Sequence, residues 1–588
     1  MLPEGKKLFT THICLPLRPC HNHTSPHMKQ LIECVPNFSE GRDPAVLKQI
    51  TDVIESVEGV TLLDVDPGKA TNRTVVTFVG EPAAVTEAAF QAIKKACEVI
   101  DMSKHTGEHP RMGATDVCPL IPIANISMEE TAEWARRLGE RVGRELDLPI
   151  YLYEAAASRP ERKNLAVIRS GEYEGLPEKL ANPEWKPDFG PARFNAKSGA
   201  TVIGARDFLI AYNVNLNTTS VRRANSVAFD VREKGRVLND PATGKPMKDA
   251  SGEPVRQPGL LKGVKAIGWY IEEYGIAQIS MNITDISATP LHEAFEACRA
   301  SADQRGMRVT GSELVGLVPL KVMLEAGKFF LRKQQRSVGV SDAELIKIAV
   351  KSMGLDELTP FDPQQKIIEY NLEKGNVAAS KALINKTLRA FSDEAASESP
   401  APGGGSVSAY VGALGVSLAT MVANLSSHKR GWDDRWEEFS DAAERGQQLK
   451  EALLRSVDED TDAFNQIMAA FGLPNATPEE KAARKAAIQA GTKVAIEVPL
   501  KVMRFGMESF PLIRQMVETG NPNSVTDAGV GALCARTAVY GAYLNVKVNA
   551  SGLDDKEYAA RVVSEAEEMM REAEAAERAI VEIVLGKL

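Results

Sequence analysis

The strongest constraint on the fold of this chain is a change of sequence pattern near residue 372. Before that point, short β-branched runs alternate with longer amphipathic segments, which predicts strands and helices in turn. After it, strand signals almost disappear and helical periodicity continues to the end. A chain of 588 residues is also too long for one hydrophobic core. We therefore expect a multi-domain protein, with α/β domains followed by an all-α helical bundle.

The α/β part divides into two segments with a similar order of elements. In residues 28–207 we expect the order βαββαβ, followed by one more helix. The expected elements cover residues 31–35, 44–56, 60–65, 73–79, 82–100, 115–123 and 128–145. A similar order recurs in residues 208–372. Both segments are therefore predicted to be split-βαβ, ferredoxin-like subdomains.

Four other stretches complete the expected organisation. Residues 237–259, within the second subdomain, are rich in Pro, Gly and Asp and are predicted to form an exposed loop. Residues 373–382 are predicted to be a linker, and the helical domain is expected to cover residues 383–588. Residues 1–27 hold four of the eight histidines and two of the seven cysteines. A metal-binding arm is one interpretation of this extension, and a disordered tail or a start site assigned too early is the simpler one.

Composition argues against several classes of function and location. A formal charge of −9 disfavours nucleic acid or an anionic membrane as the main partner. The seven cysteines form no CxxC pair, which is typical of free thiols in a reducing cytoplasm. Residues 8–17 lack the continuous apolar core of a signal peptide. Residues 407–425 are rich in small residues rather than in the Leu, Ile and Phe of a membrane span, so we expect a buried helix there and a cytoplasmic protein.

The most informative short segment is Thr106–Cys118, with the sequence TGEHPRMGATDVC. Imidazole, with a pKa of about 6.5, is the usual proton shuttle at neutral pH, and the carboxylate next to His109 can tune it. His105 and His109 are four residues apart, but Gly107 and Pro110 disfavour the continuous helix that a metal pair would need. We therefore expect no metal and interpret His109 as a catalytic acid–base. A structural histidine is the alternative.

Two more polar segments of the first half are candidates for ligand binding. Asp64–Gly68 places two acids at the end of a predicted strand, before the polar turn Thr71–Thr74. A solvated turn explains this pattern equally well. Gly190–Gly199 combines backbone donors with an aromatic residue and the cations Arg193 and Lys197. That composition suits an aromatic ring bearing carboxylates, although such loops are common.

The helical half contains three further candidates. The backbone N–H groups of Gly403, Gly404 and Gly405 could hold an anion or a polar heterocycle, unless the triple glycine is a simple linker. Asp458–Asp462 places three aspartates in one helical turn, where burial would raise the pKa of one of them, unless the turn is solvated. A helix capped by Thr477 carries a basic stripe, which suggests either a polyanionic ligand or a salt-bridged face. The stripe consists of Lys481, Arg484, Lys485, Ile488 and Lys493.

Taken together, these segments resemble the formimidoyltransferase-cyclodeaminase family from Met28 to the C-terminus. The first half resembles it in Leu31–Gly41 (LIECVPNFSEG), Leu63–Gly68 (LDVDPG), Gly107–Gly113 (GEHPRMG) and Gly311–Pro319 (GSELVGLVP). The second half resembles it in Ala401–Ser406 (APGGGS), Asp458–Phe464 (DEDTDAF) and Gly520–Gly529 (GNPNSVTDAG). Residues 1–27 and the long loop at 237–259 depart from the family pattern. Neither departure touches a proposed catalytic residue.

The resemblance implies two reactions, in histidine degradation and one-carbon metabolism. The first transfers a formimino group from N-formimino-L-glutamate to tetrahydrofolate, with His109 as the acid–base. The second cyclises 5-formiminotetrahydrofolate to 5,10-methenyltetrahydrofolate and releases ammonia, with Asp460 as the catalytic acid. Tetrahydrofolate, in its polyglutamyl form as well, is implied as co-substrate, and no metal is expected. The positions expected to contact folate are Asp66, Gly190, Arg193, Lys197, Gly199, Ala486, Gln489, Lys493, Gly403, Gly404 and Gly405.

The resemblance also implies a homo-oligomer whose cyclodeaminase site lies at a dimer contact. The chemistry of both steps agrees with the residues, because one imidazole can take the N5 proton and then protonate the leaving glutamate nitrogen. Two alternatives stay open at this point. The chain could be a monofunctional folate formimino- or formyltransferase with an inactive helical half, or a folate-binding scaffold without activity. Turnover of formiminoglutamate with tetrahydrofolate would distinguish the three.

Overall fold

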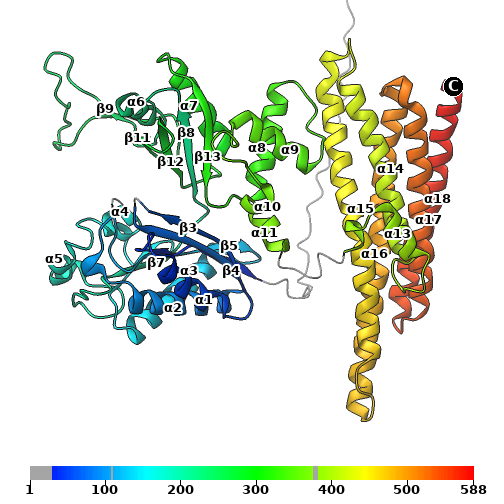
Figure 1. Ribbon diagram of the computed structural model, residues 1–588. Coiled ribbons are helices and arrows are strands. Elements are labelled where there is room, and N and C mark those ends of the chain that lie inside the picture. The colour runs from blue at the N-terminus through cyan, green and yellow to red at the C-terminus, as the bar shows by residue number, and fades with distance from the viewer. Residues whose placement is uncertain (1–29, 70, 108–109, 375–381) are drawn as a thin grey trace, which may run out of the picture. The chain divides into compact units, whose positions relative to one another are not determined.

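The chain divides into two units between Asp207 and Phe208, as Figure 1 shows in ribbon form. The computed structural model describes residues 30–69, 71–107, 110–374 and 382–588. The N-terminal extension at residues 1–27, most of the linker predicted at residues 373–382, and His109 lie outside the described residues. Each unit has a hydrophobic core of its own.

A seven-stranded sheet organises the first unit. Its strands are β1 (Leu31–Cys34), β2 (Asn37–Phe38), β3 (Val60–Gly68), β4 (Arg73–Gly80), β5 (Thr115–Ala124), β6 (Ile150–Glu154) and β7 (Thr201–Ala205). The strands lie in the order β3, β4, then β1 and β2, β5, β7 and β6. All pairs are antiparallel except that β7 is parallel to both β5 and β6. The sequence pattern did not predict β6 and β7, which are five residues long and pair with distant segments.

Three helices cover one face of this sheet (Figure 1). They are α1 (Pro44–Glu55), α2 (Pro82–Val99) and α3 (Met128–Glu145). Their apolar faces and the facing strand residues, such as Ile32 and Phe78, form one fully buried cluster. Helix α3 has the predicted bounds. It begins at a capping box in which Ser127 and Glu130 satisfy each other's backbone N–H groups.

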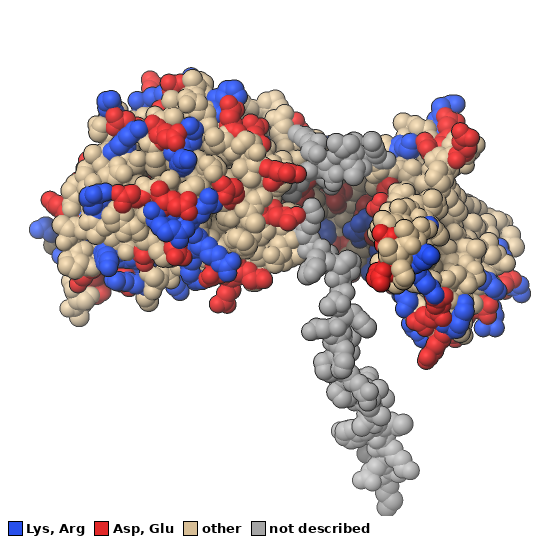
Figure 2. Space-filling view, turned by 90° about the horizontal axis from the view of Figure 1, so that it is seen from below, with Lys and Arg blue, Asp and Glu red and all other residues tan. Residues whose placement is uncertain are grey.

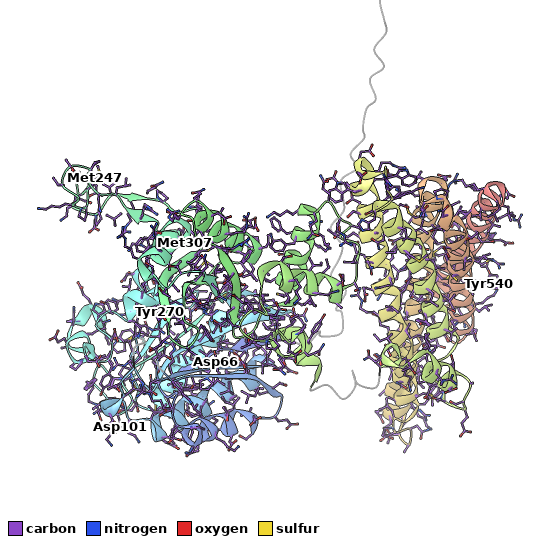
Figure 3. All side chains as sticks on the ribbon, turned by 45° about the horizontal axis from the view of Figure 1, so that its top comes forward. Asp66, Asp101, Met247, Tyr270, Met307 and Tyr540 are labelled. Atoms are coloured by element: carbon purple, nitrogen blue, oxygen red, sulfur yellow. The ribbon has the colours of Figure 1, made fainter. Side chains whose placement is uncertain are left out.

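Strand β3 extends further than the sequence predicted. The expected strand ended at residue 65, with Asp64 and Asp66 at its end. In the structure β3 continues to Gly68, because its pairing with β4 extends to Gly68 opposite Arg73, with Asp66 opposite Val75. The prediction was wrong here because polar residues lower the strand signal, while the hairpin partner supplies the hydrogen bonds that extend the strand. Asp66 is labelled in Figure 3.

The second unit begins with a four-stranded antiparallel sheet. Its strands are β8 (Ile210–Leu216), β11 (Val264–Ile271), β12 (Ile276–Ile283) and β13 (Val309–Val315), in the order β11, β12, β8, β13. Helices α6 (Val221–Val231) and α7 (Leu291–Asp303) contribute to the core on one face of this sheet, with Tyr212 and Ile279. On the opposite face Gln278 donates to Asn215, which donates to Glu357. The alternation along each strand therefore separates an apolar face from a polar one.

The segment expected as an exposed loop at residues 237–259 is exposed, but it is partly ordered by strand pairing. Strands β9 (Arg236–Val237) and β10 (Arg256–Gln257) pair at its base, and further bridges join Asn239 to Pro246 and Lys248 to Pro254. It therefore forms an irregular hairpin that carries Met247 near its end (Figure 3).

After β13, helices are the main elements of the described chain. Two of them, α8 (Leu320–Lys333) and α9 (Asp342–Met353), belong to the core of the second sheet. The helical domain is formed by α13 (Leu388–Ala395), α14 (Gly404–Ser427), α15 (Trp436–Phe471), α16 (Pro478–Thr519), α17 (Val525–Ser551) and α18 (Lys556–Lys587). The predicted capping box of α16 is present, since Thr477 and Glu480 bond to each other's backbone. The expectation of α/β domains followed by a helical domain is confirmed.

Helix α14 packs closely through small residues. A Cβ at Gly415 would lie 2.9 Å from the carbonyl oxygen of Gly531 in α17, and a Cβ at Gly412 would lie 3.0 Å from Ala538. The most apolar stretch of α14 has a mean hydropathy of 1.6, and 61% of it is buried inside the protein. These contacts fit the predicted core helix, whose glycines and alanines let neighbouring helices approach.

Within the second unit, the loop after α8 contacts the helical domain. Gly339 lies so close to α15 that a Cβ there would be 2.6 Å from the backbone nitrogen of Glu444. Its carbonyl oxygen accepts hydrogen bonds from Asn424 at 2.8 Å and Gln447 at 3.2 Å. Lys328 of α8 forms an ion pair with Glu444 at 2.5 Å. Glycine is needed at position 339 because any side chain would separate the loop from the helix.

Acidic and basic side chains are interspersed over the face seen in Figure 2. Exposed pairs one helical turn apart include Arg514 with Glu518 and Arg137 with Glu133. Each such pair contributes only about 0–1 kcal/mol, so the pairs keep the surface hydrated more than they hold the fold together.

Candidate active sites

The segment that leads to His109 is held on the turn between β3 and β4. His105 shares a hydrogen bond of 2.9 Å between its Nε2 and the carbonyl oxygen of Asn72. The side chain of Asn72 donates to the carbonyl oxygen of Thr106 at 3.0 Å and accepts from the backbone of Gly41 at 3.0 Å. His109 itself lies outside the described residues, so the structure shows only the chain up to Gly107 and from Pro110 onward.

Arg111, two residues after His109, is neutralised by two carboxylates. Arg111 forms ion pairs with Glu174 at 2.7 Å and Glu172 at 3.2 Å, and its Nε lies 3.3 Å from His105 Nδ1. The hydrogen bond to Glu174 is the main cause that raises the pKa of Arg111. Arg111 is therefore a fixed cation that joins the histidine segment to the loop at residues 172–174.

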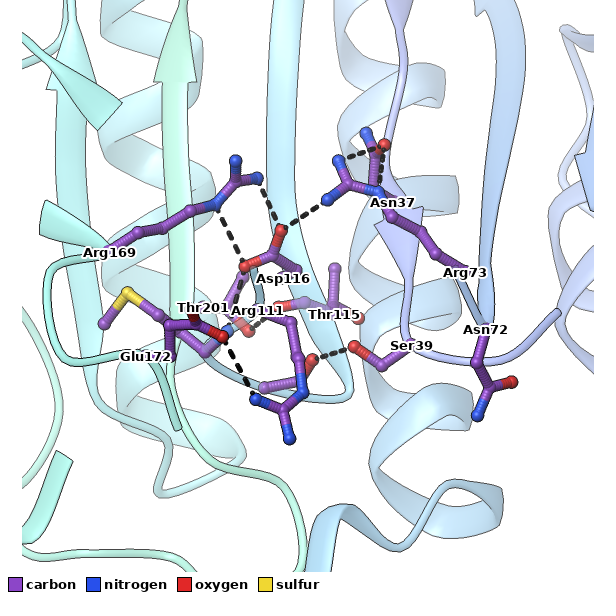
Figure 4. A network of polar contacts seen from close by, with 12 residues as sticks. Asn37, Ser39, Asn72, Arg73, Arg111, Thr115, Asp116, Arg169, Glu172 and Thr201 are labelled. Carbon is purple, nitrogen blue, oxygen red and sulfur yellow. Dashed lines mark hydrogen bonds and ion pairs between the residues drawn. The ribbon is translucent and has the colours of Figure 1, made fainter. Parts of the chain in front are cut away.

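Asp116 lies at the centre of a second ionic network in the same region (Figure 4). Its carboxylate is almost fully buried and accepts from Arg73 at 3.1 Å and from Arg169 at 2.5 Å. Its other oxygen accepts from the backbone N–H of Met112 at 3.0 Å. Arg73 also donates to Asn37 Oδ1 at 2.9 Å. Burial lowers the pKa of Arg73 to about 10, which still leaves the guanidinium protonated at neutral pH.

The loop at Gly190–Gly199 lies beside the histidine segment. Gly113 and Gly199 form a bridge, and the backbone of Ala200 donates to the carbonyl oxygen of Met112 at 3.1 Å. Gly199 has a φ of +66°, which favours glycine, and a Cβ there would lie 2.8 Å from the Cα of Gly113. The structure thus brings together two segments that are about 80 residues apart in the sequence.

The predicted folate-contacting side chains of this loop are held by local partners. Arg193 forms an ion pair with Asp147, and Lys197 donates to the carbonyl oxygen of Glu98 at 2.7 Å. Gly190 has a φ of +77°. Asp66 lies in β3, in the ladder with β4, and not in this loop.

In the helical domain, Asp460 contacts the N-terminus of α14. Ser406 donates to Asp460 Oδ2 from its backbone N–H at 2.8 Å and from its hydroxyl at 2.9 Å. Gly405 lies so close that a Cβ there would be 2.5 Å from the Asp460 carboxyl carbon. Burial raises the pKa of Asp460, and the two bonds from Ser406 act against that rise. The structure therefore joins the triple-glycine segment to one specific acid of the Asp458–Asp462 turn.

The neighbouring acids of this turn have other partners. Asp458 accepts from the backbone of Leu383 at 2.6 Å, and Glu459 forms an ion pair with Lys501 of α16 at 2.7 Å. Burial raises the pKa of Asp462, and the charges of Asp458 and Glu459 raise it further. The three aspartates thus differ in environment, and Asp460 is the one bound to the glycine segment.

The basic stripe of α16 faces the turn between α17 and α18. Lys485 pairs with Asp554 at 2.8 Å and Lys493 pairs with Asp555 at 3.0 Å. Gln489, between them, accepts from the backbone of Asp554 at 2.7 Å. Ala486 is exposed. These contacts fit the salt-bridged face that was one of the two interpretations, and they join the stripe to this turn and not to Asp460.

Sequence reasoning overlooked several residues of these networks. Asp116 was noticed only as part of the histidine motif, and Arg169 lies in a stretch with no motif at all. Ser406 was treated as the end of a glycine segment, whereas in the structure it lies in the first turn of α14 and donates to Asp460. Within the described ranges, no group of three or more His, Cys, Asp or Glu side chains could hold a metal ion.

Comparison with known proteins supplies names for the three parts of the chain. The model described as formiminotransferase domain, N-terminal subdomain, matches residues 31–206. The model described as formiminotransferase domain matches residues 211–373, and that described as formiminotransferase-cyclodeaminase matches residues 387–568.

Three curated relatives match different shares of the chain. The formimidoyltransferase-cyclodeaminase of Mus musculus is 42% identical over 95% of this chain and 99% of its own length. The glutamate formimidoyltransferase of Streptococcus pyogenes serotype M1 is 42% identical over 52% of this chain and 94% of its own. The methenyltetrahydrofolate cyclohydrolase of Methylorubrum extorquens is 40% identical over 35% of this chain and 98% of its own.

Proposed function

Because the chain belongs to the formimidoyltransferase-cyclodeaminase family, we propose that it is a bifunctional transferase and ammonia-lyase that acts on folate. It transfers the formimino group of N-formimino-L-glutamate to tetrahydrofolate. It then cyclises the product to 5,10-methenyltetrahydrofolate and releases ammonia, in histidine degradation and one-carbon metabolism. The observation that carries this conclusion is the match to a bifunctional relative over 95% of the chain.

His109 is proposed as the acid–base of the transfer step. N5 of tetrahydrofolate attacks the formimino carbon, its proton passes to the imidazole, and the imidazole then protonates the glutamate nitrogen as the C–N bond breaks. The networks around Arg111 and Asp116 support this proposal, because they fix the backbone after His109 through the N–H of Met112. An acid–base that serves two nitrogens in turn depends on such fixed positioning relative to its substrate.

Asp460 is proposed as the acid–base of the cyclisation step. N10 attacks the formimino carbon, the N10 proton is removed, and the departing nitrogen gains a proton to leave as ammonia. A carboxyl with a raised pKa is suited to hold and return that proton near neutral pH. The bonds from Ser406 orient the carboxylate and leave Asp460 Oδ1 on the side of Gly405.

Folate contacts are proposed at the positions matched by the family. In the first unit these are Asp66, Gly190, Arg193, Lys197 and Gly199. In the helical domain they are Ala486, Gln489 and Lys493, together with the backbone of Gly403, Gly404 and Gly405. The cations among them would meet the carboxylates of the folate tail, including the added carboxylates of a polyglutamyl form.

We also propose that both α/β segments are split-βαβ, ferredoxin-like subdomains. Supporting this proposal, four strands of each segment lie in the same spatial order, which places the second, third, first and fourth strand side by side. In the second segment these are β11, β12, β8 and β13. The first segment differs in carrying β7 and β6 beyond its fourth strand.

A homo-oligomer with a dimeric contact at the cyclodeaminase domain is proposed as the assembled form. The supporting observation is an exposed apolar face on two adjacent helices, called the α14–α17 face below. It consists of Val407, Leu414, Met421, Leu425, Val530, Leu533, Tyr540, Leu544 and Val548. Residues of this kind are normally covered, and a contiguous row of them favours a partner surface. Tyr540 of this face is labelled in Figure 3.

Sedimentation of the full chain tests this assembly. Replacing Leu414 and Leu544 by glutamate should reduce the size of the particle and lower cyclodeaminase activity together. An unchanged particle would show that the α14–α17 face is not the contact. A smaller particle with full activity would show that the site is complete in one chain.

A cytoplasmic location is proposed as well. In its support, the five described cysteines have free thiols. Fractionation of cells that express the tagged chain would test it, and recovery in a membrane or organelle fraction would contradict it.

One assay separates the proposed function from its alternatives. The chain is incubated with formiminoglutamate and tetrahydrofolate, and methenyltetrahydrofolate is followed by absorbance while ammonia and glutamate are measured. All three products are expected. Glutamate without ammonia would indicate a monofunctional transferase, and no product would indicate a binding protein.

A further inference from the structure

Arg169 shares its carboxylate partner with another arginine. It follows the short helix α4 (Leu165–Ile168) and donates to Asp116 from Nε at 3.3 Å and from Nη2 at 2.5 Å. Arg73 donates to the same carboxylate at 3.1 Å. Figure 4 shows both guanidinium groups on the Asp116 side chain. The charge of one carboxylate is thus divided between two cations, and Arg169 is only partly neutralised by it.

Arg169 also has an N–H donor group, Nη1, that its contacts with Asp116 do not use. Its contacts to Asp116 use Nε and Nη2, and among the described residues Nη1 has no hydrogen-bond partner. The side chain is 14% exposed, so one edge of the guanidinium reaches the surface. A guanidinium edge with two parallel N–H groups is the preferred partner of a carboxylate.

Arg111 provides a contrast within the same region. It is held by two carboxylates, those of Glu172 and Glu174, and it also contacts His105. Arg111 is therefore fully compensated inside the chain. Arg169, in contrast to Arg111, keeps both charge and a donor group for a ligand.

Arg169 is tied to the histidine segment through Asp116. The oxygen of Asp116 that accepts from Arg169 Nε also accepts from the backbone of Met112, three residues after His109. Three residues of chain span at most about 10 Å. A carboxylate bound to Arg169 would consequently lie close to the segment that carries His109.

We propose that Arg169 binds the α-carboxylate of the amino-acid donor, N-formimino-L-glutamate, while Asp116 holds the guanidinium in place. This inference rests on the proposed transferase function. The donor carries its α-carboxylate two bonds from the nitrogen that leaves, whereas the reacting end of tetrahydrofolate is an uncharged pterin. The folate carboxylates lie beyond the aminobenzoyl group. Near the reacting atoms, the donor is therefore the substrate that offers a carboxylate to this arginine.

Steady-state kinetics of Arg169→Gln and Arg169→Lys in the full chain test the proposal. Arg169→Gln should raise KM for formiminoglutamate by roughly 10- to 100-fold, the loss expected for one charge-assisted bidentate contact. KM for tetrahydrofolate should stay within about twofold. KM of Arg169→Lys for formiminoglutamate should lie between those of the wild type and Arg169→Gln, because lysine keeps the charge but lacks the two parallel N–H groups of a guanidinium. Arg144→Gln, at an exposed arginine of α3, is the control and should change neither constant.

A modified donor separates binding from a merely structural role. N-formimino-L-glutamate in which the α-carboxylate is an amide should be a poor donor for the wild type. Arg169→Gln should lose most of that discrimination, so that the ratio of the two kcat/KM values falls by roughly tenfold or more. A ratio of activities is insensitive to the fraction of enzyme that folds, and Arg169→Lys provides a second variant.

The outcomes also separate this inference from the proposed function. If the wild type transfers the formimino group but Arg169→Gln keeps the full preference for the acid over the amide, Arg169 does not bind the donor. A rise in KM for tetrahydrofolate alone would assign Arg169 to folate. A wild type without transfer activity, despite normal cyclisation of supplied 5-formiminotetrahydrofolate, would overturn the transferase itself.

Discussion

The two candidate sites differ in how their carboxylates are neutralised. In the first unit, Asp116 and Glu174, which contact the described part of the histidine segment, are paired with the guanidinium groups of Arg73, Arg169 and Arg111. In the helical domain, Asp460 of α15 is half-buried against the N-terminus of α14. Among the described side chains, no cation contributes to its pKa. Burial without a counter-charge raises the pKa of a carboxyl, whereas pairing keeps it ionised.

This difference follows from the chemistry of each step. The first step brings in a donor with two carboxylates, and cations are needed to bind it. The second step acts on a substrate whose reacting atoms carry no carboxylate, and a proton must be held and released. A site rich in arginine suits the former, and a single acid of raised pKa suits the latter.

Replacing His109 by alanine should have the largest effect and should separate the two sites. Formimino transfer should be abolished, because neither the N5 proton nor the glutamate nitrogen would have its acid–base. Cyclisation of supplied 5-formiminotetrahydrofolate should continue at the wild-type rate. Separate assays of glutamate and ammonia release check this. Loss of both activities in a folded variant would show that the sites depend on each other.

Replacing Asp460 by asparagine should have the converse effect, with loss of cyclisation and retention of formimino transfer. Glutamate release should stay intact while ammonia release falls by about two to four decades, because the amide keeps the shape but cannot carry the proton. 5-Formiminotetrahydrofolate should accumulate and can be measured by chromatography. Near-normal methenyl formation would move the role to another acid, and Asp462, whose pKa is also raised, is the first candidate.

Adding one methyl group at Gly405 should have a smaller effect, confined to the helical site. The new Cβ would overlap the Asp460 carboxylate and push it away from Ser406, so we expect a loss of roughly tenfold or more in ammonia release. Gly403→Ala should lose less, because its Cβ would meet nothing closer than 3.9 Å. Glutamate release should be unchanged in both variants. Equal losses in the two would contradict a specific contact between Gly405 and Asp460.

The smallest expected effect is on stability and depends on pH. The pKa of Asp460 is raised in the folded state, so its ionisation costs stability that develops as the pH rises from the unfolded to the folded pKa and is complete above the folded pKa. Asp460→Asn should therefore raise the melting temperature at pH 7 by at most a few degrees. The gain should shrink as the pH falls through the folded pKa towards the unfolded value. Thermal unfolding of both proteins across this range measures it. A gain that grows on acidification would mean that the carboxylate is stabilised by a partner.

The order of domains and many helix bounds could be predicted from the sequence, because they depend on neighbours in the chain. The capping boxes at Ser127 and Thr477 begin α3 and α16 by bonding groups three residues apart. The small residues of α14 indicated a close-packed core helix. Strands β6 and β7 were missed, since β7 pairs with distant segments on both sides. The end of β3 was missed for a different reason: its polar residues weaken the strand signal, although its partner β4 is the next strand in the chain.

The candidate sites show the same division between local and tertiary information. The sequence by itself determined which residue types are available for chemistry, including His109, the triple glycine and the Asp458–Asp462 turn. Only the tertiary structure decided that Asp460, and neither Asp458 nor Asp462, meets Ser406 and Gly405. The sharing of Asp116 by two arginines was likewise decided there. The physical reason is that burial and pairing set the charge state of a side chain, and both arise from segments that only folding brings together.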